Sequence, residues 1–250
     1  MTRILLSGCC GRMGQVITGL VKEETDLEIT AGIDIAAGDS LPYPVFPSFA
    51  ACTAEADVIV DFSSPHVFGS MLDYCLEKKI PAVVCTTGLS EEQIRRLEEV
   101  SSQVAMLRSA NMSVGVNLLI KLLQSAAPAL LNTGFDAEIV EKHHRMKKDA
   151  PSGTALALAE AINGSMPEAY AYAYDRTDRY EQRRKQEIGI SAVRGGTIVG
   201  EHEVIFAGTD EVITFKHTAY SRAIFAKGAI AAARFLSGRE PGLYSMQDVI

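Results

Sequence analysis

The sequence predicts an α/β protein in which a doubly wound parallel sheet precedes a second region with a mixed or mostly antiparallel sheet. Over residues 3–110, short apolar segments alternate with segments whose apolar residues recur at helical spacing, a pattern typical of a parallel sheet covered by helices. A glycine-rich turn, "GCCGRMG", directly follows the first apolar segment. Beyond residue 186 the helical spacing gives way to long extended segments, which indicates a change of architecture.

Five strands are expected in the first region. Each is a short apolar run bounded by glycine, proline or polar residues: "RILLS" at 3–7, "LEITAGID" at 27–34, "DVIVDFS" at 57–63, "PAVVCTTG" at 81–88 and "VAMLRSA" at 104–110. Helices are expected between them, because apolar residues recur every three or four positions at Met13, Val16, Ile17, Leu20 and Val21, and again at Phe68, Met71, Leu72, Cys75 and Leu76. Strand, turn and helix thus alternate.

The second region begins with a predicted helix over residues 116–131, followed by a strand in "AEIVEKHH". Three long strands are expected within residues 186–218, and a last helix from Arg222 to Leu236, which Gly238 would close. The tyrosine-rich and then charged segment at 169–186 is expected to be an exposed loop.

Composition places the chain among globular proteins. It has 250 residues, 47% of them hydrophobic, and a net charge of −7, so no nucleic-acid partner is expected, since such proteins spread Lys and Arg over their surface. "MTRILLSG" has no long apolar core and no apolar run of 18 residues is apparent, so we expect no signal peptide, no membrane partner and a cytoplasmic location. Five cysteines, an odd number without metal-type spacing, fit reduced thiols and predict no metal site.

The glycine turn is the first candidate binding site. Gly8, Gly11 and Gly14 lie between a strand and its helix, where backbone amides could approach a pyrophosphate. The spacing is G-x-x-G-x-x-G, which alone also fits an ordinary tight turn. Asp34 stands 20 residues beyond Gly14 at the end of the second strand, where a dinucleotide site needs a carboxylate for the ribose hydroxyls. The two features together favour dinucleotide binding.

Two further segments follow predicted strands. "DFSSP" at 61–65 and "CTTG" at 85–88 come at the carboxyl ends of the third and fourth strands, which is the edge where open parallel sheets bind ligands. Ordinary turn chemistry at strand ends explains them equally well.

A basic segment, "EKHHRMKKDAPSGTA" at 141–155, is the second candidate site. Three interpretations compete for its adjacent histidines and four cations, which are His143, His144, Lys142, Arg145, Lys147 and Lys148. A metal site is disfavoured, because adjacent residues on a strand point to opposite faces. A solvated basic face is the usual meaning of such a run, and an anion-binding site is the third possibility.

The residues after the cations favour an anion. In "DAPSGTALALAEAI", Asp149 or Ser152 can cap a helix, Pro151 suits its first turn, and Gly153 and Thr154 leave amide groups open to a carboxylate. Histidine and lysine beside a bound anion are also candidate proton donors. Because hydride delivery by a nicotinamide requires a matching proton, the two candidate sites complement each other.

With these motifs, the chain closely resembles the 4-hydroxy-tetrahydrodipicolinate reductase, or dihydrodipicolinate reductase, family. The resemblance covers nearly the whole chain and rests on "GCCGRMG", "VDFSSP", "CTTGL", "SANMSVGVN", "EKHHRMKKDAPSGTA" and "GTIVGEHEVIF". It implies a Rossmann-type dinucleotide-binding domain at 1–113 and 222–250, and an α+β domain with a mixed sheet at 114–221 that binds substrate and mediates homotetramer formation. The implied reaction is NAD(P)H-dependent reduction of a small cyclic imine dicarboxylate in lysine and diaminopimelate biosynthesis.

The resemblance also implies individual roles. His143 and Lys147 would be the catalytic pair, with Lys147 the first choice as proton donor, and His144, Gly153 and Thr154 would hold substrate carboxylates. The cofactor would be lined by Gly8, Cys9, Cys10, Gly11, Arg12, Met13, Asp34, Cys85, Thr86, Thr87, Ser109, Ala110, Asn111 and Met112. The chain departs from the usual family pattern at three positions, where Cys85 replaces glycine, Met112 an aromatic residue and Ser63 a threonine.

NADH is the expected preferred cofactor, with NADPH possible. Asp34 is followed by "IAAGDS", which offers a carboxylate and no cation for a 2′-phosphate, and Ile35 stands where some family members carry arginine. Arg12 is the nearby cation that could soften the preference.

Two rival functions fit part of the sequence. Another NAD(P)-dependent amino-acid or sugar-acid dehydrogenase would share the glycine turn but leave the paired histidines and "PSGT" unexplained. A non-catalytic NADH-sensing protein is disfavoured by the acidic balance and the lack of a helix-turn-helix pattern.

Overall fold

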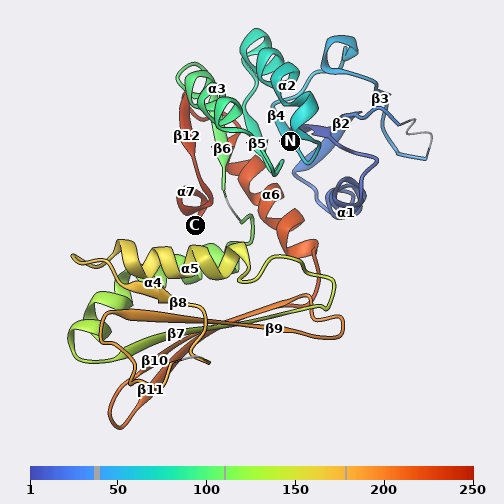
Figure 1. The fold of residues 1–250 in the computed structure, drawn as a ribbon. Helices are drawn as coiled ribbons and strands as arrows, with labels where there is room; N and C mark the ends of the chain where they lie inside the picture. Colours follow the sequence, from blue (N-terminus) through green and yellow to red (C-terminus); the bar gives the residue numbers. More distant parts are fainter. Residues whose placement is uncertain (37–39, 110, 178) are drawn as a thin grey trace. The chain divides into compact units, whose positions relative to one another are not determined.

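The computed structural model describes residues 1–36, 40–109, 111–177 and 179–250 (Figure 1). The chain forms two compact units, one of Met1–Ser113 with Ala223–Ile250 and the other of Val114–Arg222. The second unit is thus inserted into the first in sequence.

The first unit is built on a seven-stranded sheet in the order β12-β6-β5-β4-β1-β2-β3, and each neighbouring pair is parallel. The strands are β1 (Thr2–Ser7), β2 (Leu27–Ile33), β3 (Val45–Phe46), β4 (Val58–Asp61), β5 (Ala82–Val84), β6 (Ala105–Arg108) and β12 (Gly242–Tyr244). The predicted doubly wound parallel sheet is confirmed. The edge strands β3 and β12, of two and three residues, were not predicted because they are too short to show a periodicity.

Helices cover both faces of this sheet. Successive side chains of β1 alternate between them, so that Ile4 and Leu6 pack with α1 (Arg12–Val21) and α6 (Ala223–Leu236), whereas Leu5 packs with α2 (Pro65–Lys78) and α3 (Glu91–Ser101). The short helices η1 (Phe49–Ala51) and α7 (Met246–Val249) complete the unit.

One glycine of α6 has a packing reason. A Cβ atom at Gly228 would overlap the backbone carbonyl of Met112, so only glycine allows α6 to approach the segment after β6 so closely.

The second unit contains a five-stranded mixed sheet in the order β11-β10-β7-β9-β8. β10 pairs antiparallel with β11 and with β7, whereas β9 pairs parallel with β7 and with β8. Two helices pack against one face of this sheet (Figure 1). The elements are α4 (Val114–Asn132), β7 (Asp136–His143), α5 (Gly153–Gly164), β8 (Ala171–Ala173), β9 (Glu187–Arg194), β10 (Gly200–Ala207) and β11 (Val212–Ala219). The predicted α4, β7 and three long strands are confirmed.

Two local expectations need correction. The segment at 169–186 is not wholly an exposed loop, because it contains β8 and is tied down by Arg183, which contacts Asp136 at 2.7 Å and Glu138 at 2.9 Å. Pro151 does not lie in the first turn of α5, since Ser152 is the N-cap residue and accepts a hydrogen bond from the Ala155 amide at 3.2 Å.

One helix has the length and composition of a membrane span. Among the described residues, α4 is the one helix long and apolar enough to cross a membrane by length and composition, with a mean hydropathy of 1.5, although Asn117, Lys121 and Gln124 interrupt its apolar sequence. Its Leu119, Leu123 and Ala127 pack into the core of the second unit, as the apolar stripe of a globular helix does.

Candidate active site

The glycine turn brings the start of α1 against the carboxyl ends of β1 and β4. Gly8 has φ of +78°, and a Cβ atom there would lie 2.6 Å from the Phe62 carbonyl oxygen. A Cβ at Gly14 would overlap the Gly8 and Cys9 carbonyl groups. Gly11 is the N-cap residue of α1 and provides no side-chain cap, so the amides of the first turn face outward as a phosphate site needs.

Asp34 fastens this turn to the end of β2. One carboxylate oxygen accepts a hydrogen bond from the Cys10 amide at 2.9 Å, and the other accepts one from the Ala36 amide at 3.0 Å. The loop after β1 is therefore held beside the residue expected to bind a ribose.

A cavity of 290 Å³ lies at this edge of the sheet. Its lining combines the predicted Gly8, Gly11 and Asp34 with residues that the sequence did not single out, among them Ser7, Ser48 and Phe49. The buried Ser7 hydroxyl has no hydrogen-bond partner among the described residues, so it is available to a bound polar group. Close backbone approach, a carboxylate and an unpaired hydroxyl fit a dinucleotide.

The adjacent strand ends are organised by Asp61, which is fully buried. Its carboxylate accepts hydrogen bonds from Ser63 Oγ at 2.5 Å and from Thr86 Oγ1 at 2.7 Å. The hydroxyl of Thr86 is therefore turned inward, and the predicted "DFSSP" and "CTT" segments meet at one carboxylate.

The remaining predicted cofactor residues differ in exposure. Cys9, Thr86 and Met112 are buried, so they can offer a ligand mainly their backbone. Ala110 lies outside the described residues. The others are half-buried or exposed: Gly8, Cys10, Gly11, Arg12, Met13, Asp34, Cys85, Thr87, Ser109 and Asn111.

Potential metal ligands come together once among the described residues. The sulfur atoms of Cys9 and Cys10 and an oxygen of Asp34 lie within 4.8 Å of one another. Burial raises the pKa of the Cys9 thiol to about 12, and both Asp34 oxygens accept amide hydrogen bonds. The protonated thiol weakens this group as a metal ligand set at neutral pH.

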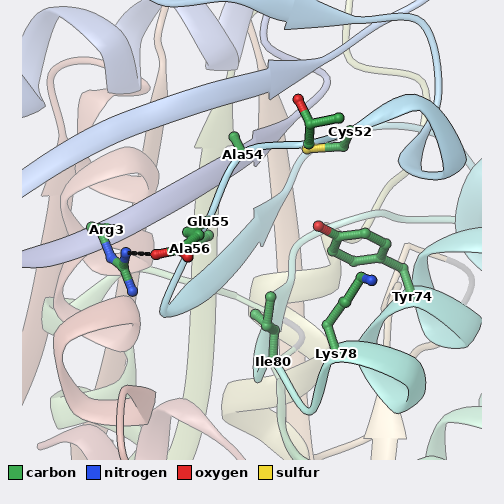
Figure 2. A pocket seen from close by; sticks show the side chains of 9 residues that line it. Arg3, Cys52, Ala54, Glu55, Ala56, Tyr74, Lys78 and Ile80 are labelled. Atoms are coloured by element: carbon green, nitrogen blue, oxygen red, sulfur yellow. Dashed lines mark hydrogen bonds and ion pairs between the residues drawn. The ribbon is translucent and has the colours of Figure 1, made fainter.

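A larger cavity, of 640 Å³, lies at the amino ends of the strands (Figure 2). Arg3 in its wall is paired with Glu55 at 2.6 Å and with Asp57 at 2.8 Å, while Tyr74 and Lys78 line it from α2. Because open parallel sheets bind ligands at the carboxyl ends of their strands, the smaller cavity is the better candidate.

In the second unit, His143 lies at the end of β7 on the buried face of the sheet. Its Nδ1 is 2.6 Å from Oε2 of Glu141, which is two residues earlier on the same face and fully buried. The hydrogen bonds that Glu141 accepts keep it ionised, so Nδ1 of His143 carries the proton and donates it to the carboxylate. Nε2 is then the nitrogen available for chemistry.

Burial lowers the pKa of His143, and the charges of Lys147 and Arg194 lower it further, while Glu141 acts in the opposite direction. His143 is therefore mainly neutral at neutral pH. Lys147 lies in the turn that follows, with Nζ 2.9 Å from Asp149, and its side chain is 20% exposed.

The turn leads into α5, where Ser152 is surrounded by buried polar groups. Its amide donates to Glu141 Oε1 at 3.0 Å, and its hydroxyl lies 2.9 Å from Nε2 of His202. Gly153 follows as the first residue of α5, and a Cβ there would meet open space, so its backbone can be approached. His144 and Thr154 are half-buried.

The sequence did not point to Arg194 or His202 as members of this cluster, and it did not reveal the role of Glu141. Glu141 shares the face of His143 at an i, i+2 spacing, a signal that the strand pattern offered. Arg194 and His202 arrive from β9 and β10 through the strand register, which the sequence did not reveal.

Comparison with known proteins gives matches over the full chain. Family models described as dihydrodipicolinate reductase, N-terminus and C-terminus, match residues 2–112 and 115–250. A 4-hydroxy-tetrahydrodipicolinate reductase from Caldanaerobacter subterraneus subsp. tengcongensis is 51% identical over 100% of this chain and 98% of its own length. One from Clostridium tetani is 48% identical over 100% and 97%. The structure of dipicolinate-bound dihydrodipicolinate reductase from Paenisporosarcina sp. TG-14 aligns over 100% of both chains with a TM-score of 0.83 and 25% identity.

The buried histidines make stability depend on pH. Burial is the main cause that lowers the pKa of His202 from 6.5 to about 4, so between these values the unfolded chain binds a proton that the folded protein does not. The contribution of the neutral His202 to the free energy of unfolding should therefore be fully present above pH 6.5. It should be lost, by up to about 3 kcal/mol, as the pH drops from 6.5 to about 4. His202→Asn should flatten the melting temperature against pH.

His66→Asn, at an exposed position of α2, is the matched control and should keep the parent's slope. A His202→Asn variant with an unchanged slope would show that His202 does not titrate as its burial requires.

Proposed function

The chain belongs to the dihydrodipicolinate reductase family, and from that membership we propose the roles of its own residues. It is an NAD(P)H-dependent oxidoreductase that reduces 4-hydroxy-tetrahydrodipicolinate in the biosynthesis of lysine and diaminopimelate. The observation that carries the proposal is the cluster of His143, Lys147 and the start of α5 around the buried Glu141.

One unit binds the cofactor and the other binds the substrate. The unit of Met1–Ser113 with Ala223–Ile250 binds the dinucleotide, with the pyrophosphate at the glycine turn and the ribose at Asp34. When bound, the reduced nicotinamide supplies the hydride. The unit of Val114–Arg222 binds the dicarboxylate and forms the contacts of a homotetramer. We place the protein in the cytoplasm, with no nucleic acid or membrane as partner.

Lys147 donates the proton that matches the hydride. His143 is mainly neutral, so its Nε2 has no proton to give, and the ammonium group of Lys147 is the better donor. Asp149 holds this ammonium group at 2.9 Å. His143 positions the substrate ring, and its Nε2 accepts a hydrogen bond from the ring or from Lys147.

His144, Gly153 and Thr154 hold the substrate carboxylates. A carboxylate at the start of α5 is favoured by the positive end of the helix dipole. The neighbouring structure from Paenisporosarcina sp. TG-14 was determined with dipicolinate bound, a ligand of the same dicarboxylate class. The cations and the helix start together also stabilise negative charge that spreads through the ring after hydride arrives.

NADH is the preferred cofactor. Asp34 repels a 2′-phosphate and accepts hydrogen bonds from ribose hydroxyls, and Ile35 beside it is 91% exposed and carries no charge. Arg12 is exposed in the glycine turn and leaves NADPH usable.

Loss of the proton donor should appear in kcat. We expect Lys147→Ala to lower kcat by about 10² to 10⁴-fold, as for a positioned general acid, and His143→Ala to act in the same direction but less severely. His144→Ala and Thr154→Ala should instead raise KM, since they remove carboxylate contacts. Steady-state kinetics with the imine substrate measures both. Parent-like kcat in the Lys147 and His143 variants would exclude them as the catalytic pair.

Cofactor preference is tested by the ratio of kcat/KM for NADH over NADPH. The parent ratio should exceed one by about tenfold, which corresponds to about 1.4 kcal/mol. Ile35→Arg adds a cation for the 2′-phosphate and should lower the ratio, whereas Ile35→Gln, similar in length and uncharged, should not. A parent that prefers NADPH would show that residues outside this loop decide the preference.

A further inference from the structure

Glu141 is a fully buried carboxylate that joins three separate segments of the second unit. It accepts hydrogen bonds from His143 Nδ1 at 2.6 Å on its own strand and from the Ser152 amide at 3.0 Å before α5. Arg194 of β9 donates to both of its oxygens, from Nη1 at 2.7 Å and from Nη2 at 2.6 Å. Such a forked pair fixes orientation as well as distance.

Burial alone disfavours the charged form of this carboxyl group. It raises the pKa of Glu141, but the hydrogen bonds from Arg194, His143 and Ser152 outweigh that effect and hold the pKa below its usual value. Removing one partner of a buried ion pair leaves the other charge uncompensated, which is costly in a low-dielectric interior. The position of the carboxylate therefore depends on Arg194.

Arg194 also reaches the turn that carries Lys147. Its Nη2 donates to the backbone carbonyl of Asp149 at 2.7 Å, and Asp149 in turn holds Lys147 at 2.9 Å. Arg194 lies opposite His143 in the register of β9 and β7, and its guanidinium group contacts both the buried acid and the turn. Its side chain is only 20% exposed.

The charges around His143 come from four elements. Glu141 lies on β7, Arg194 on β9, Lys147 in the turn and His202 on β10, with ring centroids of His143 and His202 5.1 Å apart. His202 is neutral at neutral pH, so the charges beside His143 are one acid and two cations. A buried acid beside a histidine ordinarily draws a proton onto the ring; here burial of the ring opposes that attraction most, and the charges of Lys147 and Arg194 act in the same direction as burial.

We propose that Arg194 is a positioning residue of the reaction, which acts through Glu141 to hold His143 and the turn before α5 in place and to offset the charge of the carboxylate beside the imidazole. The proposal rests on the role of His143 proposed above. The guanidinium group does not touch the reacting atoms; it fixes the tautomer of His143 through Glu141 and the path of residues 144–152 through Asp149.

The decisive measurement is the pKa of His143, read by NMR from ¹³C-labelled histidine, with His143→Asn identifying the resonance. Arg194→Gln leaves Glu141 uncompensated and should measurably raise the pKa of His143. Glu141→Gln leaves Arg194 uncompensated and should lower it by a similar amount. The double variant Glu141→Gln with Arg194→Gln removes both charges and should return the pKa toward that of the parent.

The opposite signs separate this role from general damage to the fold, which would not move the pKa in two directions. Arg194→Lys keeps the charge but not the forked contact, so its His143 pKa should stay near that of the parent while kcat falls by about tenfold or more. The acidic limb of kcat against pH should follow His143 in each variant.

Shifts of the same sign in both single variants, or none, would overturn the proposal. If the NMR shifts occur as expected but the acidic limb does not follow them, the electrostatic role of Arg194 stands and the catalytic role of His143 fails. The two claims are thus tested apart.

Discussion

The candidate site of the second unit is arranged around the fully buried carboxylate of Glu141. It lies on β7, the middle strand of its sheet, and binds the imidazole of His143, the amide that precedes α5 and the guanidinium group of Arg194. A charge at this depth is tolerated only when every lone pair is engaged, so the three segments have little freedom to move apart. The strand register brings these polar groups together, and their hydrogen bonds then fix the arrangement of the catalytic groups.

The first unit uses a related device. Asp61 ends β4, the middle strand of the seven-stranded sheet, and is fully buried while it accepts hydrogen bonds from Ser63 and Thr86. In both units a buried acid near the carboxyl end of the central strand ties neighbouring segments together. The two buried acids hold the side chains or the neighbours of the residues that we propose to bind ligands. These residues can therefore present their backbone amides to a ligand.

The sequence was sufficient for the parts that depend on local chemistry. The parallel strands, the glycine turn with Asp34 and the segment around His143 could be predicted because periodicity, turn residues and motif spacing are local signals. Strands β3, β8 and β12 were missed because two or three residues show no period. Arg194 was missed because its contact with Glu141 joins residues 53 positions apart through strand pairing. Pro151 was misplaced because several neighbouring residues could cap the same helix.

The central claim about the second unit is that Glu141 holds the start of α5. Amide hydrogen exchange at Ser152 tests this claim most directly. This amide donates to a buried carboxylate, so in the parent it should exchange as slowly as amides of β7. In Glu141→Ala the Ser152 amide and the turn at 144–151 should exchange much faster, while β4 in the other unit keeps its protection. Rapid exchange of the Ser152 amide in the parent, or unchanged protection of this amide in Glu141→Ala, would show that Glu141 does not hold the start of α5.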